Sequence, residues 1–290
     1  MLHSRVGKDN FDRICYNEKM QQGNNNSDNQ NILSYTDRKS IGSIAHAARI
    51  LVCLSNRINT VTDIARQCNF GKSTVHRVLK LLEESRLVVQ DVINRRYYMG
   101  PLVTQLTSNP ITTHEYLVLS SVEEMKRLSQ VSEETVTLDI MIGIQSFSLH
   151  EIPSQHDLKV TQGTRKAMPS FAGASAKVLL SQLSDEKLRV VMDNVDITAV
   201  TERTVTDKKL LMVQLEEIRQ HGYAVSAGEQ IPGSLCISVP VKDYMLPVVL
   251  SVVGPEIRLR PREKGIIREL KASSKCITRN IRRIFQSDKP

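Results

Sequence analysis

One short amphipathic segment constrains this chain more than any other. In Gly71–Glu84 the apolar side chains recur at i, i+3, i+4 and i+7, which predicts a helix with one buried face formed by Val75, Val78, Leu79 and Leu82. The opposite face then carries short polar and basic groups, namely Lys72, Ser73, Thr74, His76, Arg77 and Lys80. These residue types hydrogen-bond base edges and contact phosphates in the major groove of DNA.

The segments before this helix place it in a recognisable context. Ser43–Ser55 has apolar residues at helical spacing, and a second helix is expected at Asp63–Cys68 with Thr60 or Thr62 as its N-cap. Asn69–Gly71 forms the tight turn, where Gly71 is expected to supply the unusual backbone angles. Any amphipathic helix has a polar face, but two short helices and a tight turn favour a helix-turn-helix.

A β-hairpin is predicted directly after the helix-turn-helix. Leu87–Asp91 and Arg95–Met99 have strand-like composition, and Val92–Asn94 forms the tip between them. This hairpin would be the wing of a winged helix-turn-helix. Arg95 and Arg96, expected on the returning strand, are placed to contact backbone phosphates or an adjacent minor groove.

The distribution of charge agrees with DNA binding. The net charge is +8, and residues 41–110 hold nine Lys and Arg against four Asp and Glu. A basic excess in that block suits contact with a polyanion, although a solvated basic face would give the same count.

Other features limit the class of protein. The five cysteines are far apart and form no CxxC, so neither a zinc ribbon nor a disulfide framework is expected. His150-Glu151 with His156 lacks HExxH spacing, so no metal site is predicted there. No apolar run is long enough to span a bilayer, and no signal-peptide core is present. We therefore expect a soluble cytoplasmic protein without a cofactor.

The chain divides into four predicted parts. Residues 1–40 are polar and form a disordered arm, either a plain tail or a segment that touches DNA or a partner. Residues 41–103 form the DNA-binding domain, 104–131 a linker and connecting helix, and 132–290 a second domain. A long helix is expected at Tyr116–Leu128, with Leu119 and Val122 in its apolar stripe.

The second domain is predicted to be α+β, an antiparallel sheet with helices packed on it. Its predicted strands are Thr135–Ile140, Ser146–Glu151, Leu158–Thr161, Tyr223–Ala227, Cys236–Val241 and Val248–Val253. Its predicted helices are Ala172–Leu183, Asp185–Met192, Asp207–Gln220 with Thr206 as cap, and Arg262–Phe285. The arginines Arg258, Arg260 and Arg262 are expected in a solvated turn before the last helix rather than on DNA.

Two classes of function fit these features. The first is a transcription regulator whose binding to a double-stranded DNA operator is modulated by a small-molecule effector. The alternative is an enzyme acting on a small metabolite, with an appended helix-turn-helix. The C-terminal region shows no phosphate loop, GxSxG elbow, zinc pattern or dinucleotide fingerprint, which favours the regulator.

Motifs in both halves of the chain occur in a familiar order. They are Ala48–Leu51, Ile64–Arg66, Lys72–Arg77, Tyr98–Pro101, Ala176–Leu180, Ile218–Arg219, Gly222–Ala224, Glu229, Gly233, Cys236–Ile237, Pro240–Val241, Leu250–Ser251 and Gly254–Pro255. In this respect the chain resembles the isocitrate-lyase-regulator (IclR) family of bacterial transcription regulators over residues 43–285. The resemblance implies a winged helix-turn-helix followed by a GAF-like effector domain, assembled as homodimers or homotetramers.

The resemblance also implies an effector pocket for a small carboxylate or aromatic acid. The carboxylate would be held by main-chain amides at Ala174 and Ser175, with Cys236 and Ser251 as polar pocket residues. The sequence departs from some family members, because Ser226 replaces an aspartate, Val253 a serine, Ala174 a glycine and Phe171 a histidine. The pocket is therefore expected to be less polar, and to suit a bulkier or more apolar ligand than a two- or three-carbon acid.

Overall fold

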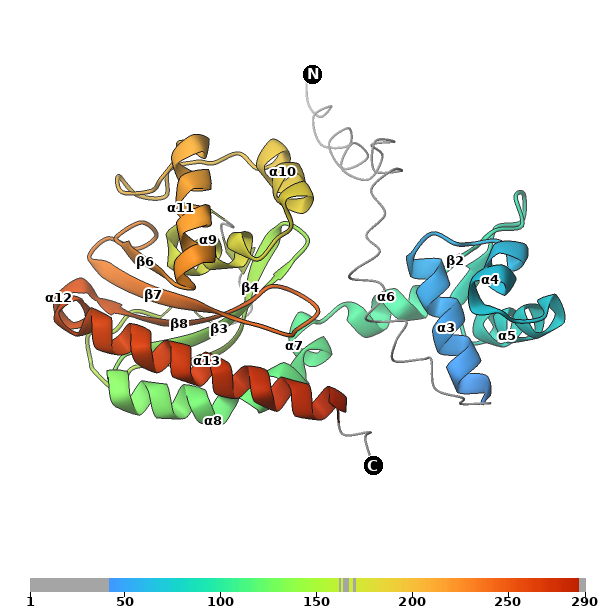
Figure 1. Ribbon diagram of the computed structural model, residues 1–290, viewed down its shortest axis with the longest axis horizontal. Helices are drawn as coiled ribbons and strands as arrows, with labels where there is room; N and C mark the ends of the chain where they lie inside the picture. The colour runs from blue at the N-terminus through green and yellow to red at the C-terminus, as the bar shows by residue number, and fades with distance from the viewer. Residues whose placement is uncertain (1–41, 162, 164–166, 169–170, 287–290) are drawn as a thin grey trace, which may run out of the picture. The chain divides into compact units, whose positions relative to one another are not determined.

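The computed structural model describes residues 42–161, 163, 167–168 and 171–286, so the predicted arm at residues 1–40 lies outside them. The described chain forms two compact units that divide between Asn109 and Pro110 (Figure 1). The first unit contains α3 (Ser43–Ser55), α4 (Val61–Cys68), α5 (Lys72–Glu84), β1 (Val88–Gln90), β2 (Tyr97–Met99) and α6 (Pro101–Thr107). This order of elements is that of a winged helix-turn-helix.

The turn between α4 and α5 is built differently from the sequence prediction. Thr60 is the N-cap of α4, and its hydroxyl accepts a hydrogen bond from the backbone N–H of Asp63 at 3.2 Å. The left-handed residue of the turn is Asn69, with φ of 54°, whereas Gly71 has an ordinary φ of −65°. The prediction for Gly71 was therefore wrong, because asparagine also tolerates the left-handed region and ends α4 two residues earlier.

The first unit has one small aliphatic core. The predicted stripe of α5 is confirmed, since Val75, Val78, Leu79 and Leu82 are all buried. From the other helices Cys53 and Cys68 join this core, with their sulfur atoms 3.4 Å apart. The two thiols are free, so they serve here as small apolar core groups.

The wing is shorter than predicted. Strands β1 and β2 pair only from Val88↔Met99 to Gln90↔Tyr97, so Arg95 and Arg96 lie between the turn Val92–Asn94 and β2, and not on the returning strand. The cause is Asp91, whose carboxylate accepts hydrogen bonds from the backbone N–H groups of Ile93 and Asn94 at 2.8 and 3.2 Å. Such a side-chain cap stabilises a turn in place of further strand pairing.

The second unit is an α+β domain. Its strands are β3 (Thr135–Ile142), β4 (Gln145–Ile152), β5 (Ala167–Met168), β6 (Ala224–Ala227), β7 (Ser234–Val241) and β8 (Val248–Pro255). Among the described residues they form one antiparallel sheet in the order β5-β4-β3-β8-β7-β6. Its helices are α7 (Pro110–Thr113), α8 (Glu115–Ser132), α9 (Gly173–Ser181), α10 (Asp185–Asn194), α11 (Lys208–His221), α12 (Glu256–Leu259) and α13 (Glu263–Gln286), with the 3-10 turn η2 (Arg260–Arg262) before α13.

The helices cover both faces of this sheet. Helices α8 and α13 pack on one face, while α9 lies on the other with α11 packed against it (Figure 1). Because side chains alternate along a strand, each face has its own core. The first core includes Leu138, Ile140 and Leu250, and the second includes Met141, Val249 and Val253.

Three sequence predictions for this unit were wrong. Leu158–Thr161 is not a strand: Leu158 is exposed, and its carbonyl accepts a hydrogen bond from the Arg258 side chain at 2.8 Å instead of a strand partner. In α8 the buried face runs through Leu117, Met125 and Leu128, while the predicted Leu119 is exposed. Helix α11 begins one residue later than expected, with Asp207 as the cap.

A buried ion pair holds α9 against the loop between β6 and β7. The Lys177 ammonium lies 2.6 Å from the Glu229 carboxylate, and their side chains are 5% and 10% exposed. The second oxygen of Glu229 accepts the backbone N–H of Gly173, at the first turn of α9, at 3.4 Å. One acidic side chain therefore fixes both the lysine and the start of the helix.

This ion pair predicts a non-additive loss of stability. Lys177→Met or Glu229→Leu leaves one buried charge without its partner, so we expect each to lower the free energy of unfolding by about 3–5 kcal/mol. The double variant should lose far less than the sum of the two. Calorimetry of the full chain, following the transition of the second unit, measures these losses.

The control is an exposed ion pair on the same unit. Lys126 and Glu123 pair at 2.9 Å with side chains that are more than half exposed, so Lys126→Met should cost less than about 1 kcal/mol. Additive effects of the two buried substitutions would contradict the coupling proposed here.

Candidate DNA-binding and effector sites

Helix α5 presents the predicted polar face to solvent. Its predicted DNA-contacting side chains are exposed or half-buried, while the four apolar residues of the stripe face the core; the outward set is Lys72, Ser73, Thr74, His76, Arg77 and Lys80. The helix begins directly after Gly71, with no side-chain cap on its first N–H groups. A helix N-terminus of this kind, with a lysine at its first position, attracts phosphate.

The wing adds two exposed cations to the same unit. Arg95 and Arg96 are both exposed, and Arg95 adopts a left-handed conformation with φ of 57°. Their place in a tight turn gives the side chains no fixed pairing along a strand. A pair of cations at such a tip suits contact with the phosphate backbone, which carries no sequence information.

The second unit brings the five predicted effector residues together at the start of α9. The backbone N–H of Ala174 donates to the hydroxyl of Ser226 on β6 at 2.8 Å. The Ser175 backbone N–H lies against the thiol of Cys236, which pairs with Ser226 in the register of β6 and β7. Ser251 follows on the next strand, bonded to Ser238 at 2.8 Å. These amides therefore already have protein partners that a ligand would have to replace.

A continuous row of polar side chains extends from this point across the sheet. We name it the polar ladder: Ser226, Cys236, Ser238, Ser251, Thr137, Asp139 and Ser148, on strands β6, β7, β8, β3 and β4. Cys236 Sγ lies 3.4 Å from Ser238 Oγ, and Ser251 is directly opposite Thr137. The hydroxyl of Thr137 donates to Asp139 at 3.1 Å. Every member is at least nine-tenths buried, which is unusual for polar groups in an otherwise aliphatic core.

Sequence reasoning missed the far half of this ladder. Asp139 alternates along β3 with Leu138 and Ile140, so a charged residue on a strand with buried neighbours was the available signal. Burial raises the pKa of the Asp139 carboxyl to about 7, while the nearby hydroxyls of Ser148 and Thr137 oppose the rise. At neutral pH this acid is therefore poised between its neutral and charged forms.

The pKa of the buried Cys236 thiol is well above its usual value. Burial raises its pKa to about 11, with the charge of Asp139 adding to the rise. A thiol that stays protonated at neutral pH is a poor nucleophile. The side chain therefore contributes a small, weakly polar surface to the site.

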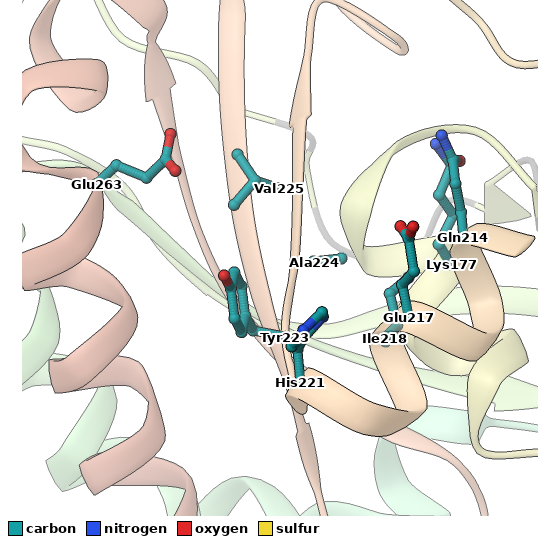
Figure 2. Close-up of a pocket in the computed structure, with 9 residues that line it drawn as sticks. All are labelled: Lys177, Gln214, Glu217, Ile218, His221, Tyr223, Ala224, Val225 and Glu263. Atoms are coloured by element: carbon teal, nitrogen blue, oxygen red, sulfur yellow. The ribbon is translucent and has the colours of Figure 1, made fainter.

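An open depression lies at the β6 edge of the sheet rather than over the ladder. Figure 2 shows side chains from α9, α11, β6 and α13 around a volume of about 300 Å³, namely Lys177, Gln214, Glu217, Ile218, His221, Tyr223, Ala224, Val225 and Glu263. It contains none of the five predicted effector residues. Its lining is mixed and strongly charged, so the depression by itself does not identify a ligand.

The remaining candidate residues have structural roles or none. Arg258 pairs with the buried Glu134 at 2.9 Å, and Arg260 pairs with Glu256 and Glu263. Arg262 donates to the Ser132 carbonyl at 3.0 Å. Within the described ranges no cluster of His, Cys, Asp or Glu is arranged to hold a metal ion. No described helix is both long enough and apolar enough to cross a membrane.

Comparison with known families covers both units. Residues 43–92 match the model of the IclR helix-turn-helix domain, and residues 111–279 match that of the C-terminal domain of the bacterial transcriptional regulator IclR. Together these two matches span most of the described chain.

Individual relatives agree with the family match. The regulator KdgR of Escherichia coli is 27% identical over 222 residues, 76% of this chain and 84% of the relative. The regulator TtgV of Pseudomonas putida is 30% identical over 243 residues, 83% of this chain and 92% of the relative. An IclR homologue of Microbacterium hydrocarbonoxydans, crystallised with 4-hydroxybenzoate, shares the fold with a TM-score of 0.54 at 20% identity, over 83% of this chain and 99% of that one.

These matches also decide between the two classes of function, because the family consists of regulators and not of enzymes. The helix-turn-helix unit and the second α+β unit each match their counterparts in it. The chain belongs to the IclR family of DNA-binding transcription regulators, with an N-terminal helix-turn-helix domain and a C-terminal effector-binding domain.

Proposed function

We propose that this regulator binds its operator through α5 and the wing, and that a small organic acid bound at the start of α9 changes its affinity for that operator. The observation that carries this proposal is the convergence of the first turn of α9 with the buried polar ladder. Buried polar groups cost stability unless they are hydrogen-bonded, so a row of them in an aliphatic core favours a purpose beyond folding. An anion at a helix N-terminus supplies such a purpose.

The ligand's carboxylate would replace the protein group that now accepts a hydrogen bond from the first turn of α9. The Ser226 hydroxyl now accepts from the Ala174 N–H. When a ligand binds, this hydroxyl would rotate and donate a hydrogen bond to the ligand's carboxylate. The Ala174 N–H would then donate to the same carboxylate instead of to Ser226. Cys236 and Ser251 would line the site beyond it. The Microbacterium homologue, whose crystals contain 4-hydroxybenzoate, supports an aromatic acid as one ligand class.

Very small acids should bind poorly. Val253 is an apolar buried residue beside Cys236 in the strand register, and Ala174 adds a methyl group at the helix start. Phe171 is also buried next to α9. These groups offer contact area to a larger ligand and no further hydrogen bonds to a short one.

Control of DNA binding requires that the ligand binds two arrangements of the protein unequally. We retain residues 41–103 as the DNA-binding domain, 104–131 as the linker with the connecting helix, and 132–290 as the effector domain. Family members are expected to act as dimers or tetramers, with the α3 segment Ala48–Leu54 pairing the DNA-binding domains. The cytoplasm is the compartment in which such a protein meets its operator.

The first prediction concerns the outer face of α5. Arg77→Ala and Lys72→Ala should each leave the fold intact and weaken operator binding, because both side chains are exposed. Loss of a base-edge contact would cost about 1–3 kcal/mol, while loss of a phosphate contact would mainly lower the salt dependence. Gel shifts with DNA selected from a random pool measure both effects. The control is Lys275→Ala, which removes an exposed cation from α13. If all three variants bind the operator with equal affinity, α5 does not contact DNA.

The wing makes a different prediction. Replacing Arg95 and Arg96 together with alanine should weaken binding to operator and random DNA by nearly the same factor, because contacts to the phosphate backbone carry no sequence information. Fluorescence anisotropy with the two DNAs at one salt concentration gives the two factors. A loss confined to the operator would show instead that the wing reads bases.

The effector site can be blocked by charge. Ser175→Glu places a carboxylate beside the helix start, so it should abolish the effect of organic acids on operator binding while ligand-free binding stays near wild type. Ser175→Ala keeps the backbone amide and should respond normally. Titration of a panel of organic acids into the protein–operator complex is the measurement. A full response in Ser175→Glu would place the effector elsewhere.

A further inference from the structure

Two buried polar atoms on facing strands of the second unit lack a hydrogen bond of normal geometry among the described residues, although the Ser148 hydroxyl is near enough to Asp139 to lower the pKa of its carboxyl. They are Oδ1 of Asp139 on β3 and the hydroxyl oxygen of Ser148 on β4, which face one another in the strand register. The residues are 3% and 1% exposed. Native proteins satisfy nearly all such atoms, since each unpaired group costs about 1–3 kcal/mol. This pair therefore points to a partner outside the chain.

The pair lies on the sheet face that carries the start of α9. Asp139 accepts a hydrogen bond from Thr137 of the polar ladder, and its charge raises the pKa of Cys236 on the same face of the sheet. Two strand spacings, roughly 10 Å, separate the strands of Cys236 and Asp139. A ligand with its acid at α9 would reach Asp139 only if it were several bonds long.

We propose that Asp139 and Ser148 form a second subsite, which binds a hydroxyl group at the end of the effector remote from its carboxylate. The effector is then a hydroxy acid of medium length, and this inference rests on the function proposed above. A hydroxyl group supplies one donor for Asp139 Oδ1 and one acceptor for the Ser148 O–H, which matches the two unpaired atoms.

Other groups fit this subsite less well. A second carboxylate would lie beside Asp139 in a buried space, where like charges repel strongly. An ammonium group brings three donors, whereas Asp139 offers it one unpaired carboxylate oxygen, and the neighbouring Glu151 carboxylate already accepts the Gly163 N–H. A neutral hydroxyl requires no charge to be buried.

Matched acids test the proposal on the full-length protein. The pairs are benzoate with 4-hydroxybenzoate, 3-phenylpropanoate with 3-(4-hydroxyphenyl)propanoate, and hexanoate with 6-hydroxyhexanoate; 6-aminohexanoate is a third member of the last set. Calorimetric titration should show at least one hydroxy acid binding about tenfold tighter than its partner, the gain of one well-made hydrogen bond. The amino acid should bind more weakly than the hydroxy acid.

Two variants assign the preference to the subsite. Ser148→Ala should reduce the ratio between the paired affinities severalfold, and Asp139→Val should bring it close to one. Ser121→Ala removes an equally buried serine on α8, across the sheet, and should leave the ratio unchanged. The unfolding temperature of ligand-free Ser148→Ala should equal or exceed that of wild type, because the lost hydroxyl makes no hydrogen bond of normal geometry to the protein.

The outcomes separate this inference from the proposed function. If paired acids bind equally well, or if 6-aminohexanoate binds tightest, the hydroxyl subsite is wrong while the acid site at α9 stands. If Ser148→Ala unfolds at a clearly lower temperature, the two residues are structural and the inference is also overturned. If none of these acids binds wild type, the inference and the proposed function both fail.

Discussion

The effector domain depends on one buried ion pair, Lys177 with Glu229. A lysine and a glutamate that are both nearly out of water cost several kcal/mol each in desolvation, so they persist only as a pair. Their pairing joins the second turn of α9 to the loop after β6, and the free oxygen of Glu229 reaches the backbone of Gly173. The first turn of α9 is thereby fixed directly above Ser226 and Cys236. Helix α9 has no side-chain N-cap of its own, so this tie acts together with the Ala174–Ser226 hydrogen bond and the apolar packing of the helix to position its amides.

The two faces of the sheet have different tasks. The face under α8 and α13 is built from leucine, isoleucine and valine, and supplies most of the buried apolar area that stabilises the unit. The opposite face gives part of that stabilisation up, because hydroxyls, a thiol and a carboxyl replace aliphatic groups along five strands. A protein that only needed to fold would gain by filling this row with valine. Its polarity supports the ligand site that we propose for this face of the effector domain.

The DNA-binding unit depends on a simpler feature, which is that helix α5 has a buried apolar face and an exposed polar face along its whole length. The buried stripe of α5 fixes the helix on its neighbours and leaves polar and basic side chains outside. The wing shows how local chemistry modifies such a pattern. Asp91 caps the backbone of the turn, and this shortens the hairpin and moves Arg95 and Arg96 from a strand to its tip. Cations at a tip can follow the phosphate backbone, whereas a regular strand would have directed them to alternate sides.

The sequence by itself determined the order of elements, the recognition helix and the family, because periodicity, caps and motif order are local properties of the chain. It also predicted Ala174, Ser175, Ser226, Cys236 and Ser251 as effector-binding residues, although only through resemblance, and this stays a prediction. Periodicity was insufficient at Leu158–Thr161. There the Arg258 side chain, distant in the sequence, donates a hydrogen bond to the Leu158 carbonyl, which in a strand would accept from a neighbouring strand. Only the tertiary structure showed that Glu229 pairs with Lys177, and that Asp139 faces Ser148 with an unpaired oxygen. These facts depend on strand register and on which face of the sheet a helix covers, and a one-dimensional pattern contains neither.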